Sequence, residues 1–249
     1  MLDLIVAPRM PKVIEILREA TRSRHANLAS IPAMSRLFAA DYTVSEYKSH
    51  LGRMLGLIEP LERAAFLAAE ESAEAANLDQ GAGKQASGPE SRVDSTGSCV
   101  GVKTPTYQSQ PIARPGFPAA CYAGHPDILP NRSSDLRSDL IAMGMTEVEI
   151  DGLERCLHVP SLSGPRRRGF TYVILGSMLG GKLIVKQLSS VLGSEGSYSF
   201  YGGGEKKYAT QWASFRSDLE ETGQHEVETV CATAIEIFDV YAAWLSEPL

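Results

Sequence analysis

The chain has 249 residues, which suffices for one substantial domain or two small ones with a well-buried core. Its composition is 43% hydrophobic and 22% charged, near the average of globular proteins, which excludes wholesale disorder and a coiled-coil rod. The formal net charge of −6 argues against a nucleic-acid-binding protein that uses a broad basic face.

The cysteines and the apolar segments indicate the compartment. None of the cysteines has the Cys-x-x-Cys spacing of a zinc ribbon, so we interpret them as the reduced thiols of a cytoplasmic protein. The first eight residues contain no basic segment before their short apolar run, so no signal peptide is predicted. No stretch approaches ~18 uninterrupted apolar residues, so we expect no membrane partner. The cysteines are Cys99, Cys121, Cys156 and Cys231.

Helical periodicity dominates the first part of the chain, residues of about 10–76. Steps of three or four connect a first set of positions, which indicates one face of a helix. Thr43 and Glu46 form a capping box that predicts a second helix start at Thr43, and Pro60 predicts a kink in that helix. The first face comprises Ile14, Leu17, Arg18, Thr21, His25 and Leu28, and the second Tyr47, Leu51, Met54, Leu55 and Ile58.

The middle of the chain, about 77–132, differs in kind. It is rich in Gly, Pro, Ser and Gln and has no sustained apolar period. A structureless segment of this length is unusual inside a compact domain, so we interpret it as a flexible insertion.

Helical patterns return over about 133–246. A capping box at Thr146 and Glu149 predicts a helix that carries Leu153 and Leu157 and ends before Pro160. The most apolar stretch follows, and two amphipathic patterns end the chain. These three segments are 170–192, 205–221 and 224–245. The sequence therefore predicts an all-α protein, one helical domain over residues 1–249 with the insertion at about 77–132.

Two motifs carry candidate chemistry, and the first is His25. It lies on the same predicted helix face as Arg18, two turns away. Such a histidine is either a hydrogen-bonded core or boundary residue, or a metal or haem ligand. In the second case, Arg18 could meet an anionic group of the ligand.

The second motif is the glycine-rich run from Leu175 to Lys182. It fits most of a phosphate-binding P-loop, but Leu183 stands where that motif needs Ser or Thr, and no alternating strand and helix pattern accompanies it. Alternatively, the glycines Gly176, Gly180 and Gly181 lie in a helix. Their missing side chains would then admit either a flat ligand or a neighbouring helix.

Together the two motifs resemble the haem oxygenase family. The run Leu17-Arg-Glu-Ala-Thr-Arg-Ser-Arg-His25 is similar to its proximal-helix signature, and Tyr172-Val-Ile-Leu-Gly-Ser-Met-Leu-Gly-Gly181 is similar to its glycine-rich distal helix, particularly in the bacterial branch. The resemblance continues through Phe200-Tyr-Gly202, Trp212-x-x-Phe215 and Ala234-Ile-Glu-Ile-Phe238. It covers about 12–70 and 135–245.

The resemblance implies a helical fold that holds haem between a proximal and a distal helix and cleaves it with O₂ and electrons into biliverdin, CO and ferrous iron. His25 would be the axial iron ligand, and Gly176, Gly180 and Gly181 would line the distal face. Arg18 matches a cation that pairs with a haem propionate, and Phe238 matches an aromatic residue of the pocket wall. The implied partners are haem, an electron-donor protein (ferredoxin, flavodoxin or reductase) and, as a candidate consumer of the product, a bilin-binding photoreceptor.

Two features depart from the family pattern. Ser177 stands where many members carry an Asp that orders the proton-delivering water, and a hydroxyl offers no anionic acceptor. The late propionate-binding cations have no clean match, and Lys206, Lys207 and Arg216 are the nearest candidates. Because of Ser177, a haem-binding protein that stores or senses haem without turnover is the alternative function, and a P-loop nucleotide hydrolase is a third.

Overall fold

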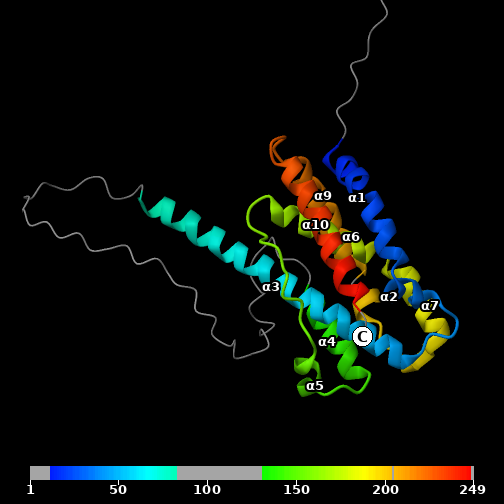
Figure 1. Cartoon of the computed structure of the whole chain (residues 1–249). Coiled ribbons are helices and arrows are strands. Elements are labelled where there is room, and N and C mark those ends of the chain that lie inside the picture. The colour runs from blue at the N-terminus through cyan, green and yellow to red at the C-terminus, as the bar shows by residue number, and fades with distance from the viewer. Residues whose placement is uncertain (1–11, 83–130, 204, 248–249) are drawn as a thin grey trace, which may run out of the picture.

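The computed structural model describes residues 12–82, 131–203 and 205–247 (Figure 1). These residues form helices and no strand, which confirms the all-α prediction. The elements are α1 (Val13–Ser30), α2 (Pro32–Ser35), η1 (Arg36–Phe38), α3 (Val44–Ala82), α4 (Arg132–Ala142), α5 (Glu147–Gly152), α6 (Arg166–Leu179), α7 (Gly181–Leu192), η3 (Gly193–Glu195), α8 (Ser199–Gly202), α9 (Glu205–Glu220) and α10 (Val227–Ser246).

Both predicted capping boxes are confirmed. The Thr43 hydroxyl accepts the backbone N–H of Glu46 at 3.2 Å, and the Glu46 carboxylate accepts the backbone N–H of Thr43 at 2.8 Å. Thr146 and Glu149 make the same reciprocal pair at the start of α5. Each pair satisfies backbone donors that the first turn of a helix leaves free. α3 then continues through Pro60 without a stop, as the sequence predicted.

The helix predicted after Thr146 is shorter than expected. α5 ends at Gly152, and Leu157, which was expected on it, is 88% exposed. The chain becomes extended at Leu153, and the backbone N–H of Cys156 donates to the carbonyl of Gly56 on α3 at 2.9 Å. Gly56 permits this approach, since a Cβ there would lie 2.5 Å from the carbonyl oxygen of Glu154. A tertiary hydrogen bond thus replaces the next helical turn.

The apolar stretch 170–192 is divided between two helices. Gly180 ends α6 and precedes the first residue of α7. A glycine tolerates such a break because it lacks a Cβ and carries little helix propensity.

α10 is the central helix of the bundle and packs against both α1 and α6 (Figure 1). It is the one helix in the described ranges that is long and apolar enough to cross a membrane by length and composition. Half of its most apolar window is buried inside the protein, as expected for a core helix. Its buried side chains include Val230, Ala234, Ile237, Phe238 and Tyr241.

α1 and α6 run in the same general direction. α1 leads into α2 and η1, α6 leads into α7, and α7 packs against η1. The C-terminal ends of α1 and α6 therefore lie at the same end of the bundle.

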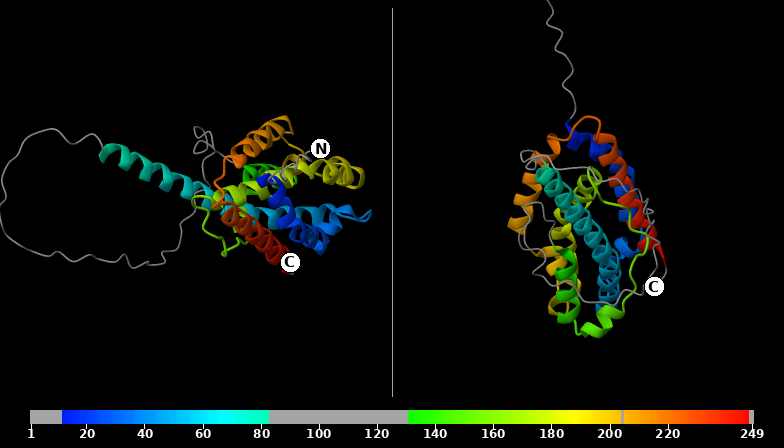
Figure 2. Two further views of the ribbon diagram at one scale, coloured as in Figure 1. Left: turned by 90° about the horizontal axis from the view of Figure 1, so that it is seen from above. Right: turned by 90° about the vertical axis from the view of Figure 1, so that its left-hand side faces the viewer.

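Buried carboxylates connect the other helices. Glu62 of α3 is 4% exposed and accepts the backbone N–H groups of Arg132 and Ser133 at the start of α4, at 2.7 and 3.2 Å. Burial raises the pKa of Glu62 to about 7. Asp139 of α4 accepts the backbone N–H groups of Ser199 and Phe200 in α8. Beyond these contacts the second half of α3 extends away from the other helices (Figure 2, left).

Candidate functional site

His25 lies on α1 with an exposed side chain, although the sequence pattern placed it on a mostly buried face. Its ring meets the buried ring of Phe238 on α10 edge to face, with centroids 6.0 Å apart. Beside it, Arg24 pairs with Asp239 at 2.8 Å and ties the same two helices together. Neither ring nitrogen of His25 has a hydrogen bond to any residue that the structure describes. The imidazole is therefore oriented by an aromatic contact and keeps its lone pair available.

A hydrogen bond connects α1 directly to α6. The Thr21 hydroxyl donates to the Leu17 carbonyl of its own helix at 2.8 Å and lies 3.2 Å from the Tyr172 hydroxyl. Since the Thr21 proton is already used, Tyr172 donates to Thr21. Thr21 is 2% exposed, so this contact closes the space between the two helices at that level.

His25 and Gly176 each lie four residues beyond that contact, on the same faces of α1 and α6 as Thr21 and Tyr172. The two helices run in the same direction, so both residues lie one turn further toward the same end of the bundle. Outside its own helix, no heavy atom lies within 4 Å of the position that a Cβ of Gly176 would take. One turn past the Thr21–Tyr172 contact, the His25 imidazole on α1 and the open backbone of Gly176 on α6 therefore lie on the same side of the bundle.

The glycines of α6 and α7 fall into two kinds. A Cβ at Gly180 would have only the carbonyl oxygen of Ser177 nearby, at 3.8 Å, so Gly180 is open in the same way as Gly176. Gly181 is buried, and a Cβ there would collide with the backbone carbonyl of Tyr201. Gly169 is also closely packed, with Val230 O at 2.5 Å from its would-be Cβ. Gly176 and Gly180 thus present open backbone, whereas Gly169 and Gly181 let helices approach.

The same stretch excludes the P-loop alternative. A P-loop needs a strand before the glycines, but Phe170–Leu175 belongs to α6. Lys182 is the second residue of α7 and follows a helix, so the strand–loop–helix geometry of a phosphate cradle is missing.

Ser177 is exposed, and its hydroxyl donates to the carbonyl of Ile174 at 2.7 Å. The hydroxyl keeps its acceptor lone pairs while its proton satisfies its own helix. Ser177 can therefore hold a water that donates to it, but in this rotamer it does not itself donate outward.

The predicted cations are spread over two helices. Arg18 is exposed two turns before His25 and makes no ion pair within residues 12–82, 131–203 and 205–247. Arg216 is exposed on α9, which packs against both α1 and α6. Lys206 and Lys207 belong to α9, but their side chains lie outside the described part of the structure.

Sequence reasoning missed the Thr21–Tyr172 contact and the packing role of Gly169. Thr21 stood on the predicted inner face of its helix, but nothing in the sequence pairs it with a residue 151 positions away. No group of three or more His, Cys, Asp or Glu side chains suited to a metal ion occurs in the described ranges. A single axial histidine, by contrast, suffices for haem, whose porphyrin supplies the other nitrogens.

The comparisons with known proteins add little to this geometry. No protein-family model matches the chain, and no curated protein sequence matches it. A solved structure of haem oxygenase from Leptospira interrogans is similar to this chain, with 15% sequence identity and a TM-score of 0.47, covering 96% of this chain and 100% of that one. A similarity of this size does not assign an activity, so function must be argued from the residues of α1 and α6.

Proposed function

We propose that this protein binds haem between α1 and α6, with His25 as the axial iron ligand, and cleaves it to biliverdin, CO and ferrous iron. The observation that carries the proposal is the position of Gly176, open and one turn past the Thr21–Tyr172 contact, at the level of His25. The two motifs that resemble the haem oxygenase signatures are thus the two that the fold brings to one side of the bundle.

The residues present suit a flat macrocycle. The His25 imidazole is exposed and unpaired in the described structure, and the edge contact with Phe238 restricts its rotation. Facing the other side of the haem ring, Gly176 and Gly180 would expose backbone where a side chain would occupy the space for O₂. Arg18, with Arg216 and Lys207 on α9, would pair with the propionates. When bound, haem supplies the iron that activates O₂ as well as the carbon that is oxidised.

The chain's own part is to hold, orient and hydrate the substrate. The Thr21–Tyr172 hydrogen bond fixes the spacing of the two helices one turn before His25 and Gly176. Ser177, the residue after Gly176, would position a water through its free acceptor lone pairs, and that water would be the nearest proton source on the distal side.

A second candidate function is haem storage or sensing without turnover. The observation in its favour is that the Ser177 hydroxyl spends its proton on Ile174 and offers no carboxylate to order water. Both functions use the same binding residues and differ only in proton delivery.

The oxygenase function also implies partners and a compartment. Electrons must come from outside, from a ferredoxin, a flavodoxin or a reductase, since the proposed site supplies no redox group other than haem. The reduced cysteines inferred from the sequence fit the cytoplasm, and a bilin-binding photoreceptor is a candidate consumer of the product. We place the whole function in one helical domain that includes the segment at about 77–132, most of which lies outside the described residues.

The test is a two-step spectroscopic assay on the full chain. Addition of haem is expected to give a Soret band with an axial-histidine signature. Addition of a reductant under O₂ is then expected to bleach that band and produce a biliverdin spectrum. Binding without bleaching would support the storage or sensing function, and no Soret band would contradict both.

Gly180→Leu tests the assignment of the distal side. A Cβ there meets only the carbonyl oxygen of Ser177, at 3.8 Å, and the rest of the leucine side chain would project into the space proposed for O₂. We expect blocked or redirected cleavage with His25 ligation and melting temperature little changed. If Gly180 served only helix packing, the variant would instead lose ~1–3 kcal/mol of stability and make the same bilin isomer at the wild-type rate.

A further inference from the structure

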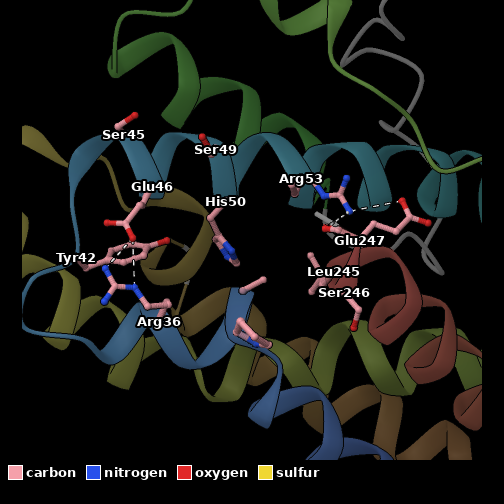
Figure 3. Close-up of a pocket in the computed structure, with 12 residues that line it drawn as sticks. Arg36, Tyr42, Ser45, Glu46, Ser49, His50, Arg53, Leu245, Ser246 and Glu247 are labelled. Carbon is pink, nitrogen blue, oxygen red and sulfur yellow. Dashed lines mark hydrogen bonds and ion pairs between the residues drawn. The ribbon is translucent and has the colours of Figure 1, made fainter. Parts of the chain in front are cut away.

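A second cavity lies apart from the His25 site. It has a volume of about 430 Å³ and lies between α2, the first turns of α3 and the C-terminal end of α10 (Figure 3). This volume falls in the range of small-molecule sites. His25 and the glycines of α6 do not line it. A ligand of this cavity would therefore be a different molecule from the haem proposed above.

Tyr42 reaches into this cavity from the segment between η1 and α3 (Figure 3). The residue is 5% exposed, and its hydroxyl has no hydrogen bond to any residue that the structure describes. The hydroxyl of Tyr241 also lacks a partner but is sealed in the core, whereas that of Tyr42 is directed into the open space between α2 and α3 (Figure 3). A mostly buried polar group without a partner is costly, so the Tyr42 hydroxyl points to a ligand.

The Tyr42 hydroxyl is neutral and held in a fixed direction. Burial and, to a smaller degree, the nearby carboxylate of Glu46 hold the pKa of Tyr42 well above its usual value, although Arg36 opposes them. The phenol therefore keeps its proton at physiological pH and can donate it to an acceptor. Its ring packs against Arg36, whose guanidinium carbon lies 5.8 Å from the ring centroid. The cavity thus offers an oriented O–H donor.

The ion pair next to Tyr42 already uses its hydrogen-bonding groups within the protein. Each carboxylate oxygen of Glu46 accepts two hydrogen bonds, Oε1 from the guanidinium of Arg36 and Oε2 from the backbone and hydroxyl of Thr43. The third nitrogen of the Arg36 guanidinium donates to Asp41 at 2.7 Å. An ammonium or carboxylate group of a ligand would have to compete with these bonds, whereas a neutral oxygen can accept from Tyr42 and leave them intact.

The other end of the cavity is electrically balanced as well. The side chain of Arg53 is 13% exposed and faces the carboxylates of Glu247 and Glu154, each at 3.7 Å, of which only Glu247 lines the cavity. His50, which also lines it, is neutral because burial lowers its pKa to about 4. The lining therefore carries two guanidinium groups and two carboxylates. A charged ligand gains little there, because attraction to one member of each pair is offset by repulsion from the other.

The remaining lining favours a ligand with an apolar body. Pro32 and Ala33 of α2 and Leu245 of α10 supply aliphatic surface. Ser45 and Ser49 of α3 border the cavity, but their hydroxyls point away from α2 (Figure 3). Sites for small molecules commonly combine such apolar surface with a few placed polar groups, and here the free polar group is a phenol.

From these observations we infer that the cavity binds a small uncharged molecule with an apolar body and a carbonyl oxygen that accepts a hydrogen bond from the Tyr42 hydroxyl. The inference does not depend on haem binding, because none of the residues proposed to contact haem lines the cavity. It assigns the space between α2, α3 and the end of α10 to a second ligand.

Four probes of similar shape separate the ligand classes. Acetophenone carries the neutral carbonyl, isopropylbenzene has neither charge nor acceptor, benzoate is an anion and benzamidine is a cation. Each is titrated into the full-length protein while the methyl resonances of Ala33 and Leu245, which line the cavity, are followed by NMR. We expect acetophenone to shift both methyl groups and to bind about tenfold more tightly than either charged probe, because the balanced lining does not repay the loss of hydration of a charge.

Two variants that each remove one phenolic hydroxyl make a matched pair. Tyr42→Phe is expected to bind acetophenone about tenfold more weakly than wild type and isopropylbenzene equally well, since only acetophenone can accept from the hydroxyl. Tyr47 is also buried, but it donates to the carbonyl of Ser197 at 3.0 Å and does not line the cavity. Tyr47→Phe is therefore expected to leave both affinities unchanged.

Three results would overturn the proposal. The first is tighter binding of benzoate or benzamidine than of acetophenone, or no shift of the Ala33 and Leu245 methyl groups with acetophenone. The second is equal affinity of acetophenone for Tyr42→Phe and wild type. The third is an equal loss for acetophenone and isopropylbenzene in that variant, which would reflect a change of cavity shape. If Tyr42→Phe does not fold by circular dichroism, the probe series on the wild-type protein decides alone.

Discussion

His25 and His50 belong to the same helical bundle but differ in burial and in hydrogen bonding. His25 is exposed on α1, touches Phe238 edge to face and has no hydrogen bond to a described residue. His50 is buried on α3, pairs with Tyr201 at 2.6 Å and has its pKa lowered to about 4 by burial. An exposed, unpaired imidazole can coordinate a metal centre, whereas a buried neutral one is fixed as a hydrogen-bonding group. The same side chain therefore supports two chemistries, which its surroundings select.

The largest effects are expected when each imidazole ring is removed, and they should differ between the two histidines. His25→Ala is expected to reduce haem turnover to background and remove the axial-histidine spectrum, with a free energy of unfolding within about 0.5 kcal/mol of wild type, because the side chain is exposed. His50→Ala is expected to keep the haem spectrum and lose ~1–3 kcal/mol, since it leaves the Tyr201 hydroxyl without its partner. Haem titration and urea unfolding on the same samples measure both effects. An unchanged axial spectrum in His25→Ala would refute the ligand assignment.

The pH dependence of the free energy of unfolding tests whether buried His50 is neutral in the folded protein. His50 titrates at about 4 when folded and at its ordinary 6.5 when unfolded, so its contribution is complete above pH 6.5 and is lost as pH falls through 4. Glu62 titrates at about 7 when folded against an ordinary 4.5, so its contribution is complete below pH 4.5 and is lost as pH rises through 7. Each is of order 3 kcal/mol, and the two oppose each other between pH 4.5 and 6.5.

Single variants are expected to reveal how the free energy of unfolding changes with pH for each group. In that pH window, Glu62→Gln should become more stable as pH rises, because of the two opposing groups only His50 remains, and His50→Gln should become less stable. Urea unfolding of both variants and the wild type at three pH values within the window measures the slopes. Slopes equal to that of the wild type in both variants would show that neither group titrates as described.

The two kinds of glycine on α6 give the next effect in size. Gly169→Ala is expected to cost ~1–3 kcal/mol, because its Cβ would lie 2.5 Å from the carbonyl oxygen of Val230. Gly176→Ala meets open space and is expected to gain up to ~1 kcal/mol from helix propensity while it slows haem cleavage. Thermal melting and bilin formation are the measurements. The distinction fails if both variants shift the melting temperature equally.

The smallest effect is expected from replacement of residues 83–130. α3 ends at Ala82, about 30 Å along the helix from Glu62, which holds the start of α4. A flexible Gly/Ser linker of about 14 residues spans that distance when extended. We expect unchanged haem affinity and cooperative melting, since closure entropy depends only weakly on loop length. Loss of either property would show that the segment belongs to the fold.

The local features of this protein follow from its sequence. The capping boxes at Thr43 and Thr146 depend on reciprocal bonds between residues three apart, and both form. The helical periods around Leu17 and Phe238 reflect burial of one face, and both residues are buried. The resemblance of the His25 and Gly176 segments to haem oxygenase motifs also needed no coordinates.

Other features depend on contacts between distant segments, which no local pattern encodes. The bond from Cys156 to Gly56 ended α5 early, and the approach of Tyr201 gave Gly181 a packing role that its neighbour Gly180 does not share. The sequence placed His25 on a buried face, whereas the packing of α1 against α10 leaves it exposed. His50 carried no signal at all, because its burial and its partner Tyr201, 151 residues away, arise only when α3 and α8 meet in the folded bundle.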